Sequence, residues 1–508
     1  MFSYVSGMIT AKVKFHAIET GKPIVVLNDE DIKELGVHIG DRILISADGK
    51  SITAIIDATT SFVNAGEVAL FEEVKEVLDV VDGDKVEIKP AGRPKSVQFI
   101  KKKLDGNKLA EHEIRSIVQD IVDNNLSDIE LSSFVSAVYV NGYDMDEVVA
   151  MTNAMVETGA SVDFGPDSVD KHCIGGVPGN RTTMLVVPIM GAGGLNCPKT
   201  SSRAITSPAG TADTMEVLAG VEFSLDELKE IIAKVNCCMV WGGAVNLAPA
   251  DDKIIRAEYP MSLDPEGQVL ASVMAKKKSV DADYLVIDIP VGKSAKIEDM
   301  GMANELARKF IELGKRLDIE TECLITDGSS PIGKGIGPAL EARDVLLALD
   351  GKGPMDLVNK SLDLAGTLFE LSGKASVGEG RMLAESILSS GKAKQKMMEI
   401  IEIQGGNPAV KPADIVLGDK TYEIQSTLKG NIKSMDNKII ARIARAAGAP
   451  KDKEAGIYLH ANVGDLVKKG DSLFTIYAKT ESKLSDAISL AEKLKPVKVG
   501  GLVLDKVT

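Results

Sequence analysis

Hydrophobic and polar positions follow different periods in successive parts of the chain, and each part predicts a different kind of domain. In the first 92 residues, short β-rich runs are separated by Gly and Asp turns, which is typical of a small β-barrel. The expected strands are 9–17, 23–28, 41–46, 52–56 and 85–89. The segment Pro-Ala-Gly-Arg-Pro at 90–94 marks the end of this domain.

From residue 93 the apolar positions recur every three or four residues, which predicts helices. The expected helices are 110–123, 128–140 and 145–157. Ser127 with Glu130 and Asp144 with Glu147 have the spacing of capping boxes at two of the helix starts. We therefore expect a small helical domain over 93–165, with a later helical insertion near 250–280.

The rest of the chain alternates strand-like and helical runs. Between 166 and 418 this alternation predicts a large α/β domain with a mixed sheet covered on both faces. Its clearest strands are 284–289 and 321–326, and its clearest helices are 225–235, 299–317 and 362–371. A final α+β domain is expected over 419–508, with β-rich runs near 422–426, 456–460 and 473–477. The predicted fold class is therefore multidomain α/β.

Composition narrows the function. The chain has 508 residues, and a net charge of −15 argues against non-specific nucleic-acid binding. Its five cysteines are odd in number and lack CxxC spacing, so neither a disulfide framework nor a zinc site is expected. No run of eighteen apolar residues and no export signal is visible, which predicts a cytoplasmic protein without a membrane span.

Two polar runs, 170–183 and 199–213, stand out within the α/β part. Each combines Gly and hydroxyl residues with a cation, and each leads into a segment that can start a helix, at 182–191 and 211–218. Backbone N–H groups at a helix start favour phosphate. Gly and Ser/Thr are also ordinary turn and cap residues. An interpretation as ordinary turns and caps does not explain Lys171-His172 in the first run or Ser-Ser-Arg with Gly-Thr-x-Asp in the second. We therefore favour the interpretation that each run is a loop that binds an anion.

The second run resembles the signature of thymidine and pyrimidine-nucleoside phosphorylases. That signature is filled by Ser202, Arg203, Gly210, Thr211, Asp213 and Glu216. The first run resembles the family's Lys-His-Ser-Thr-Gly-Gly-Val, with Cys173 and Ile174 in place of Ser and Thr. The segments Gly-Gly-Val-Pro-Gly-Asn, Ser-Arg-Ala-Ile-Thr-Ser and 241–252 are similar to the family's archaeal AMP phosphorylase branch. Residues 1–92 resemble the double-psi barrels of some ATPases, but no Walker motif follows.

The resemblance implies a pentosyltransferase. Its expected reaction is reversible phosphorolysis of AMP, and of other nucleoside 5′-monophosphates such as CMP and UMP, to free base and ribose 1,5-bisphosphate. This reaction belongs to nucleotide salvage and degradation. The implied partners are AMP and inorganic phosphate, with neither nucleic acid nor membrane, and the implied assembly is a homodimer or larger homo-oligomer. No metal and no organic cofactor is required by the motifs.

The resemblance also assigns site residues. Phosphate binding is expected from Lys171, Thr183, Ser201 and Thr211. Substrate binding is expected from Gly176, Ser202, Arg203, Ala204, Ile205, Thr206, Ser207, Thr211, Ser272, Lys276 and Lys296. Asp264 is the first catalytic candidate, as the acid that protonates N7 of the departing purine, and His172 is the second.

Each assignment has a structural alternative. An Asp before a Pro is a common helix cap, and His172 is also explained as an ordinary loop histidine. Arg203 suits either a phosphate or a bracing carboxylate such as Asp213. Lys296 needs no explanation if it is a surface lysine.

Three other functions also stay open. A pyrimidine-nucleoside (thymidine) phosphorylase would not need a 5′-phosphate on its substrate. A phosphoribosyltransferase of the anthranilate type would use a metal-bound pyrophosphate. A non-catalytic nucleotide-binding assembly module would bind without turnover.

Overall fold

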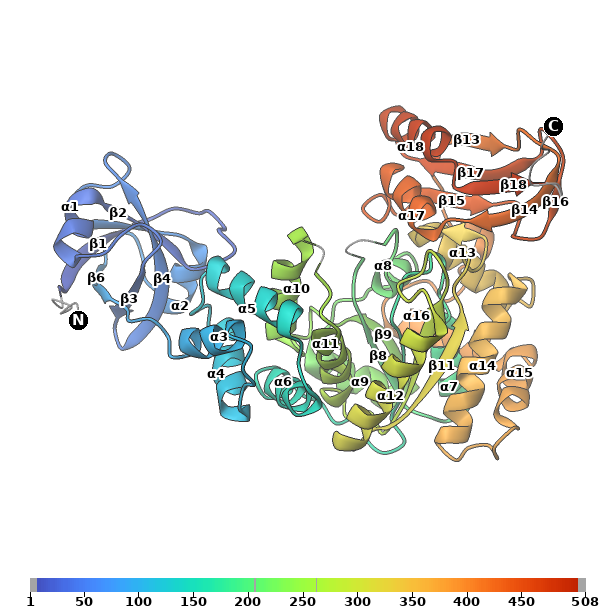
Figure 1. Cartoon of the computed structure of the whole chain (residues 1–508), viewed down its shortest axis with the longest axis horizontal. Helices are drawn as coiled ribbons and strands as arrows, with labels where there is room; N and C mark the ends of the chain where they lie inside the picture. Colours follow the sequence, from blue (N-terminus) through green and yellow to red (C-terminus); the bar gives the residue numbers. More distant parts are fainter. Residues whose placement is uncertain (1–6, 205–206, 262, 501–508) are drawn as a thin grey trace. The chain divides into compact units, whose positions relative to one another are not determined.

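The computed structural model describes residues 7–204, 207–261 and 263–500, and within them the chain forms two compact units. The first unit comprises Met1–Thr158 and Pro249–Ala271, and the second comprises Gly159–Ala248 and Ser272–Thr508. Helix α11 (Glu266–Lys278) begins in the first unit and ends in the second. Figure 1 labels the elements along the chain.

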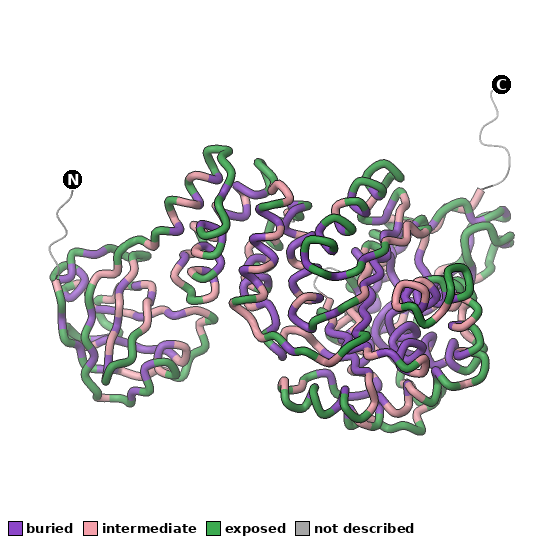
Figure 2. The backbone as a smooth tube through the Cα atoms, turned by 90° about the horizontal axis from the view of Figure 1, so that it is seen from below, coloured by how far each residue is buried: buried purple, intermediate pink, exposed green. Residues whose placement is uncertain are grey.

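A closed six-stranded barrel opens the first unit, in the strand order β1-β5-β2-β4-β3-β6 (Figure 1). Its strands are β1 (Ile9–Phe15), β2 (Ile24–Asn28), β3 (Arg42–Ala47), β4 (Lys50–Thr59), β5 (Glu67–Leu70) and β6 (Lys85–Pro90), with helices α1 (Asp29–Leu35) and α2 (Glu72–Leu78). Buried and exposed residues alternate along the strands, so one face fills the barrel (Figure 2). The expected strands are present, whereas β5 and both helices were not expected.

Helices make up the remainder of the first unit. They are α3 (Ser96–Leu104), α4 (Glu111–Val122), α5 (Asp128–Asn141), α6 (Met145–Glu157), α10 (Pro249–Glu258) and the short η1 (Tyr259–Met261). Both expected capping boxes form. The amide of Glu130 donates to Ser127 Oγ at 3.3 Å and that of Glu147 to Asp144 Oδ1 at 2.9 Å, while each glutamate accepts from its cap residue's amide.

Parallel strands form the centre of the second unit. Strands β7 (Val169–Cys173), β10 (Tyr284–Val291) and β11 (Glu320–Asp327) form one sheet in the order β11-β10-β7, and β8 (Cys197–Ser201) pairs with β9 (Cys237–Trp241). The expectation of a mixed sheet is wrong for these described strands, because each of these pairings is parallel. Helix α12 (Met300–Arg316) connects β10 to β11, and a helical crossover of this kind places the two strands in the same direction.

Eight of the helices described in the second unit pack against these strands or against one another. They are α7 (Thr183–Ala192), α8 (Thr211–Met215), α9 (Leu225–Val235), α12 (Met300–Arg316), α13 (Pro338–Leu349), α14 (Met355–Leu371), α15 (Gly380–Ser389) and α16 (Lys392–Ile403). Residues Thr183 to Gly191 of α7 are all buried, and α7 packs against α14 and α16. This helix lies at the centre of the largest apolar core.

The last part of the second unit is α+β. It contains η2 (Pro412–Asp414), β13 (Lys420–Gln425), β14 (Gly430–Met435), α17 (Asn437–Ala446), β15 (Gly456–Leu459), β16 (Leu466–Val467), β17 (Ser472–Ala478), α18 (Glu481–Leu494) and β18 (Val497–Gly500). One sheet has the order β12-β15-β17-β13, so the two-residue strand β12 (Gly335–Ile336), from much earlier in the chain, forms its edge. The loop before α13 is thereby joined to the C-terminal sheet.

Two searches of the described residues bear on membranes and metals. No helix in this part of the chain is both long enough and apolar enough to cross a membrane. Within the same residues, His, Cys, Asp and Glu side chains form no group of three suited to hold a metal ion.

The buried ion pair between Lys103 and Glu147 stabilises the helical bundle. The ammonium lies 2.7 Å from the carboxylate, and both side chains are 3% exposed. Because loss of one partner leaves a buried charge, we expect Glu147→Ala to lower the free energy of unfolding by about 3–5 kcal/mol. Glu111→Ala, which breaks an exposed pair with Arg115, is the control and should cost under about 1 kcal/mol. Urea denaturation measures both, and equal losses would contradict the prediction.

Candidate active site

A pocket of about 310 Å³ opens in the second unit, where the two polar runs meet. It is lined by residues from β7 and the loop after it, from β8 and the loop after it, and from the end of α11. The lining thus joins three separate parts of the sequence at the carboxyl ends of parallel strands. This is the edge at which α/β folds usually bind ligands.

The first loop of the pocket needs glycine. Gly176 has φ +91°, and a Cβ atom there would lie 2.5 Å from the backbone nitrogen of Lys296. Gly179 has φ +74°, and a Cβ atom there would overlap the carbonyl oxygen of Ile332. Only glycine fits both conformation and space. The loop can therefore lie against two neighbouring segments before α7 begins.

Asp170 is the centre of one buried charge cluster. Its two carboxylate oxygens accept from Lys199 Nζ at 2.8 Å and from Lys277 Nζ at 2.5 Å. All three side chains are nearly inaccessible to solvent. Burial raises the pKa of Asp170, but the two ammonium groups outweigh it and the net pKa is lowered. Burial also lowers the pKa of Lys277, and Asp170 opposes that shift while Lys199 adds to it.

Asp288 on β10 is the centre of a second buried cluster. Lys360 Nζ lies 2.9 Å and Lys171 Nζ 3.8 Å from its carboxylate. Asn180 and Thr326 donate to the same group at 3.1 and 2.6 Å. Across both clusters four buried ammonium groups face two carboxylates. Since burial penalises unbalanced charge, this excess of positive charge favours an anion in the pocket.

Hydroxyl groups in the wall of the pocket also lack partners. Thr200 Oγ1 and Ser201 Oγ are buried, and neither makes a hydrogen bond within the described part of the chain. Both residues line the pocket. Since buried polar atoms almost always have a partner, these two hydroxyls are suited to bind a ligand.

Arg203 is used as a brace for the second loop. Its two terminal nitrogens contact the two carboxylate oxygens of Glu216, each at 2.7 Å, and one of them lies 2.8 Å from Glu222. Asp213 is more distant, at 3.7 Å, and its carboxylate instead accepts from the amides of Ala204 and Gly210. Of the two roles that the sequence left open for Arg203, this geometry favours the structural one.

Ten of the residues expected from the sequence line this pocket. They are Lys171, His172, Thr183, Ser201, Ser202, Arg203, Ala204, Ser207, Thr211 and Lys276. Gly176 and Lys296 lie beside the pocket, with the backbone of Lys296 packed against Gly176. Ser272 is one helical turn before Lys276 on α11. Ile205 and Thr206 lie outside the described residues, and Asp264 is an exposed residue of the other unit, just before α11.

Charge and burial set the protonation states of the last two residues of β7, just before the first loop. Burial, reinforced by Lys277, Lys199 and Lys171, lowers the pKa of His172 well below its ordinary value, so its imidazole is neutral at neutral pH. Burial and Asp288 raise the pKa of Cys173 to about 11, so this side chain is a thiol. Both groups can exchange hydrogen bonds with a ligand without carrying charge.

Sequence reasoning missed several polar residues of the site. They are Asp170, Arg181, Lys199, Lys277, Asp288, Glu341 and Lys360. For some of them the sequence carries a signal, namely a charged residue inside an apolar strand, as in Val-Ile-Asp-Ile-Pro at 286–290. Such a residue must be paired when it is buried. Lys360 and Glu341 lie on helices α14 and α13, where charged residues are common at exposed positions, so neither carries such a signal.

Three family models match most of the chain. The helical bundle domain of a glycosyl transferase family matches residues 97–159, and the α/β domain of a glycosyl transferase family matches residues 165–394. The C-terminal domain of pyrimidine nucleoside phosphorylases matches residues 431–497.

Curated relatives match nearly the full length. The chain is 51% identical to an AMP phosphorylase of Thermococcus kodakarensis over 499 residues, 98% of this chain and 99% of the relative. It is 51% identical to that of Pyrococcus furiosus, over 97% of this chain and 98% of the relative. It is 48% identical to that of Methanocaldococcus jannaschii, over 99% of this chain and 100% of the relative. The chain belongs to the AMP phosphorylase family. The family resemblance found in the two polar runs is thereby confirmed.

A solved structure shares part of the fold. Anthranilate phosphoribosyltransferase from Thermus thermophilus superposes with a TM-score of 0.52 at 20% identity, over 60% of this chain and 98% of that chain. At this identity the likeness concerns the fold alone.

The buried lysines predict that anion binding is coupled to proton uptake. Because the pKa of Lys277 is lowered in the empty pocket, an adjacent dianion should raise it and draw in a proton. Affinity for inorganic phosphate should therefore fall as the pH rises above neutral, through the lowered pKa. Calorimetry at about pH 8 in buffers of different ionisation enthalpy measures the proton count.

The control for this prediction is the next residue along α11. Lys277→Met should abolish the uptake, whereas Lys278→Met, at a partly exposed position, should leave it unchanged. Binding that is independent of buffer in the unmodified protein would contradict the prediction.

Proposed function

We propose that this protein catalyses the reversible phosphorolysis of AMP to adenine and ribose 1,5-bisphosphate. The observation that carries the proposal is the pocket with its excess of buried positive charge, which the two polar runs build in a chain that is similar over nearly its full length to relatives named AMP phosphorylase. CMP and UMP are further candidate substrates. The product class is the same for all three, namely a free base and a ribose that carries two phosphates.

The proposed mechanism requires a held nucleophile. Lys171, Thr183, Ser201 and Thr211 would bind the attacking phosphate with one oxygen facing C1′ of the ribose. The positive pocket would stabilise that dianion and keep it close to the electron-poor ribosyl centre as the bond to the base breaks. Lys171 is suited to this task, because its ammonium is buried and fixed by Thr182 Oγ1 at 2.8 Å.

The departing base needs a proton. We propose that Asp264 supplies it at N7 of the purine, and that neutral His172 contacts the ribose or the base as a hydrogen-bond partner. Ser272 and Lys276, one turn apart on α11, would contact the base. Ser202, Ala204, Ser207 and Lys296, with Ile205 and Thr206, are proposed to bind the 5′-phosphate.

Several wider features are part of the same proposal. The parallel pairings of β1 with β5 and of β2 with β4 support a double-psi barrel. Five free cysteines suit a reducing cytoplasm. We also propose a homodimer or larger homo-oligomer, for which light scattering would give a mass of two or more chains. A mass of one chain would reject the assembly and leave the reaction untouched.

Substrate choice tests the proposed reaction. A site built for a dianion leaves buried donors unpaired when the 5′-phosphate is missing, and such sites reject the analogue by about 10⁴-fold. We therefore expect kcat/KM for AMP to exceed that for adenosine by orders of magnitude in a phosphate-dependent assay. Ser207→Ala and Lys296→Ala should reduce the difference in kcat/KM between AMP and adenosine, mainly by weakening the binding of AMP. Lys293→Ala should leave that difference unchanged.

The rival functions give different outcomes in that assay. Comparable turnover of adenosine, uridine or thymidine would indicate a pyrimidine-nucleoside phosphorylase. Turnover of a pyrophosphorylated ribose that depends on magnesium would indicate a phosphoribosyltransferase. Binding of AMP without any product would indicate a non-catalytic module.

The role of Asp264 is tested separately. If it is the general acid, Asp264→Asn should keep AMP binding but lower kcat for AMP by about 10²–10⁴-fold. Glu266→Gln, at an exposed carboxyl two residues later, is the control and should keep kcat. A variant with unchanged turnover and only a lower melting temperature would show that Asp264 is a helix cap.

A further inference from the structure

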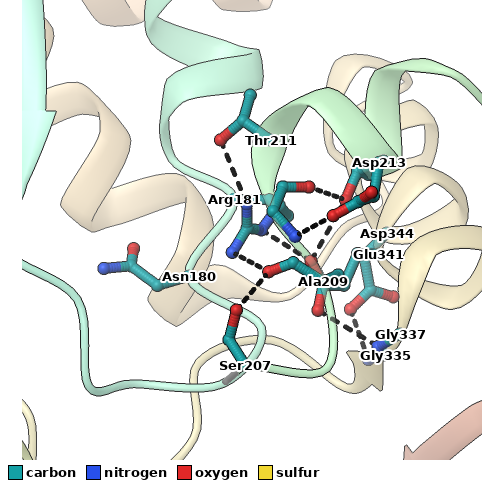
Figure 3. Close-up of polar contacts among 12 residues, drawn as sticks. Asn180, Arg181, Ser207, Ala209, Thr211, Asp213, Gly335, Gly337, Glu341 and Asp344 are labelled. Carbon is teal, nitrogen blue, oxygen red and sulfur yellow. Dashed lines mark hydrogen bonds and ion pairs between the residues drawn. The ribbon is translucent and has the colours of Figure 1, made fainter. Parts of the chain in front are cut away.

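Arg181 occupies a position between the two loops of the pocket. It lies two residues before the start of α7 and lines the pocket, and its side chain is 12% exposed. One terminal nitrogen donates to Thr211 Oγ1 at 3.0 Å and the other to the carbonyl oxygen of Ala209 at 3.2 Å (Figure 3). Arg181 therefore ties the first loop directly to the residue of the second loop proposed to bind phosphate.

Glu341 on α13 holds the guanidinium of Arg181 in place through an ion pair. Its carboxylate lies 2.6 Å from Arg181 Nε, as an ion pair rather than an aligned hydrogen bond, and it is 1% exposed. Glu341 also accepts from the amide of Gly337 at 3.1 Å and from Thr214 Oγ1 at 3.3 Å (Figure 3). With its carboxylate bonded on several sides, Glu341 leaves Arg181 little freedom to turn.

The anchored guanidinium retains donors for a ligand. A guanidinium has five N–H groups. Two of those of Arg181, one on each terminal nitrogen, donate to Thr211 and Ala209, and its Nε faces Glu341 as an ion pair. One hydrogen on each terminal nitrogen is left, which is the pair of donors that binds two oxygens of a phosphate. The neighbouring hydroxyl of Thr200, which is 6% exposed and has no partner in the described residues, lines the same pocket.

We propose that Arg181 is a further binding residue for the attacking inorganic phosphate, and that Glu341 is the residue that positions it. The inference rests on the proposed function, and it deepens that function by assigning Arg181 to one of the two phosphates. The attacking phosphate is favoured because Arg181 lies between residues proposed to bind it: its guanidinium donates to Thr211, and Thr183 follows it by two residues at the start of α7.

Direct binding of inorganic phosphate, without nucleotide, tests the proposal. Arg181→Lys keeps the charge but loses the two-pronged geometry, and the dissociation constant for phosphate should rise by about 10- to 100-fold. Arg308→Met, at an exposed arginine on α12, is the matched control and should not change it. Calorimetry measures both. Because nucleotide is absent, this result does not depend on whether AMP is the substrate.

A second variant removes the ion pair as a whole. Replacing both Arg181 and Glu341 with Met avoids a lone buried charge, and such replacements usually keep the fold. The double variant should have a melting temperature close to that of the unmodified protein. It should bind phosphate as weakly as Arg181→Lys or more weakly. Glu341→Gln should weaken phosphate binding less than either, because Arg181 is present but less firmly held.

Steady-state kinetics distinguishes a role of Arg181 in positioning from a role in folding. It also distinguishes the attacking phosphate from the 5′-phosphate of AMP. In the AMP reaction, Arg181→Lys should raise KM for phosphate and leave KM for AMP within about twofold. A raised KM for AMP with an unchanged KM for phosphate would overturn the assignment in favour of the 5′-phosphate. Unchanged phosphate affinity in both Arg181→Lys and the double variant would overturn the proposal as well. So would unfolding of Arg181→Lys alone. If the unmodified protein binds phosphate but does not cleave AMP, the proposed function fails while the Arg181 assignment stands.

Discussion

The pocket depends on one electrostatic constraint, the excess of buried ammonium groups over buried carboxylates around Asp170 and Asp288. Lys199 and Lys277 share one aspartate, and Lys171 and Lys360 share the other. Asp170 lies on β7 and Asp288 on the adjacent parallel strand β10, so the sheet brings both clusters close to the same loops. Their charge is incompletely balanced by the protein, and the pocket is therefore selective for an anion before any loop residue contacts it.

Carboxylates from distant segments determine where the two loops lie above these clusters. Arg203 of the second loop is fixed by Glu216, which also contacts Lys453 from the C-terminal region at 2.8 Å. Arg181 of the first loop is fixed by Glu341, which binds the amide of Gly337 next to the edge strand of the C-terminal sheet. The C-terminal part of the second unit thus supports both loops, although none of its described residues lines the pocket. A change in that part should reach the pocket through these two arginines.

Local sequence signals predicted the parts of the fold that rest on local physics. Ser127 and Asp144 start helices as their capping boxes indicate, and the strands around Asp288 and Thr326 follow from apolar runs. Strand β12 was not predictable, because two residues carry no period and their pairing with β15 depends on the tertiary fold. In the site, the loop residues were found through their motifs, whereas Lys360 and Glu341 contact Asp288 and Arg181 from helices whose sequence does not indicate those contacts.

The same constraint links stability to ligand binding. An empty pocket holds mutually repelling ammonium groups and the hydroxyls of Thr200 and Ser201, which have no partner among the described residues, and both features cost free energy in the empty protein. A bound dianion would balance that charge, complete those hydrogen bonds and raise the depressed pKa of Lys277 together. Each of these gains exists only in the occupied state, so each contributes to affinity rather than to the stability of the empty protein. Substitutions that relieve the repulsion, such as the loss of Lys277, should therefore stabilise the empty chain while they weaken its hold on phosphate.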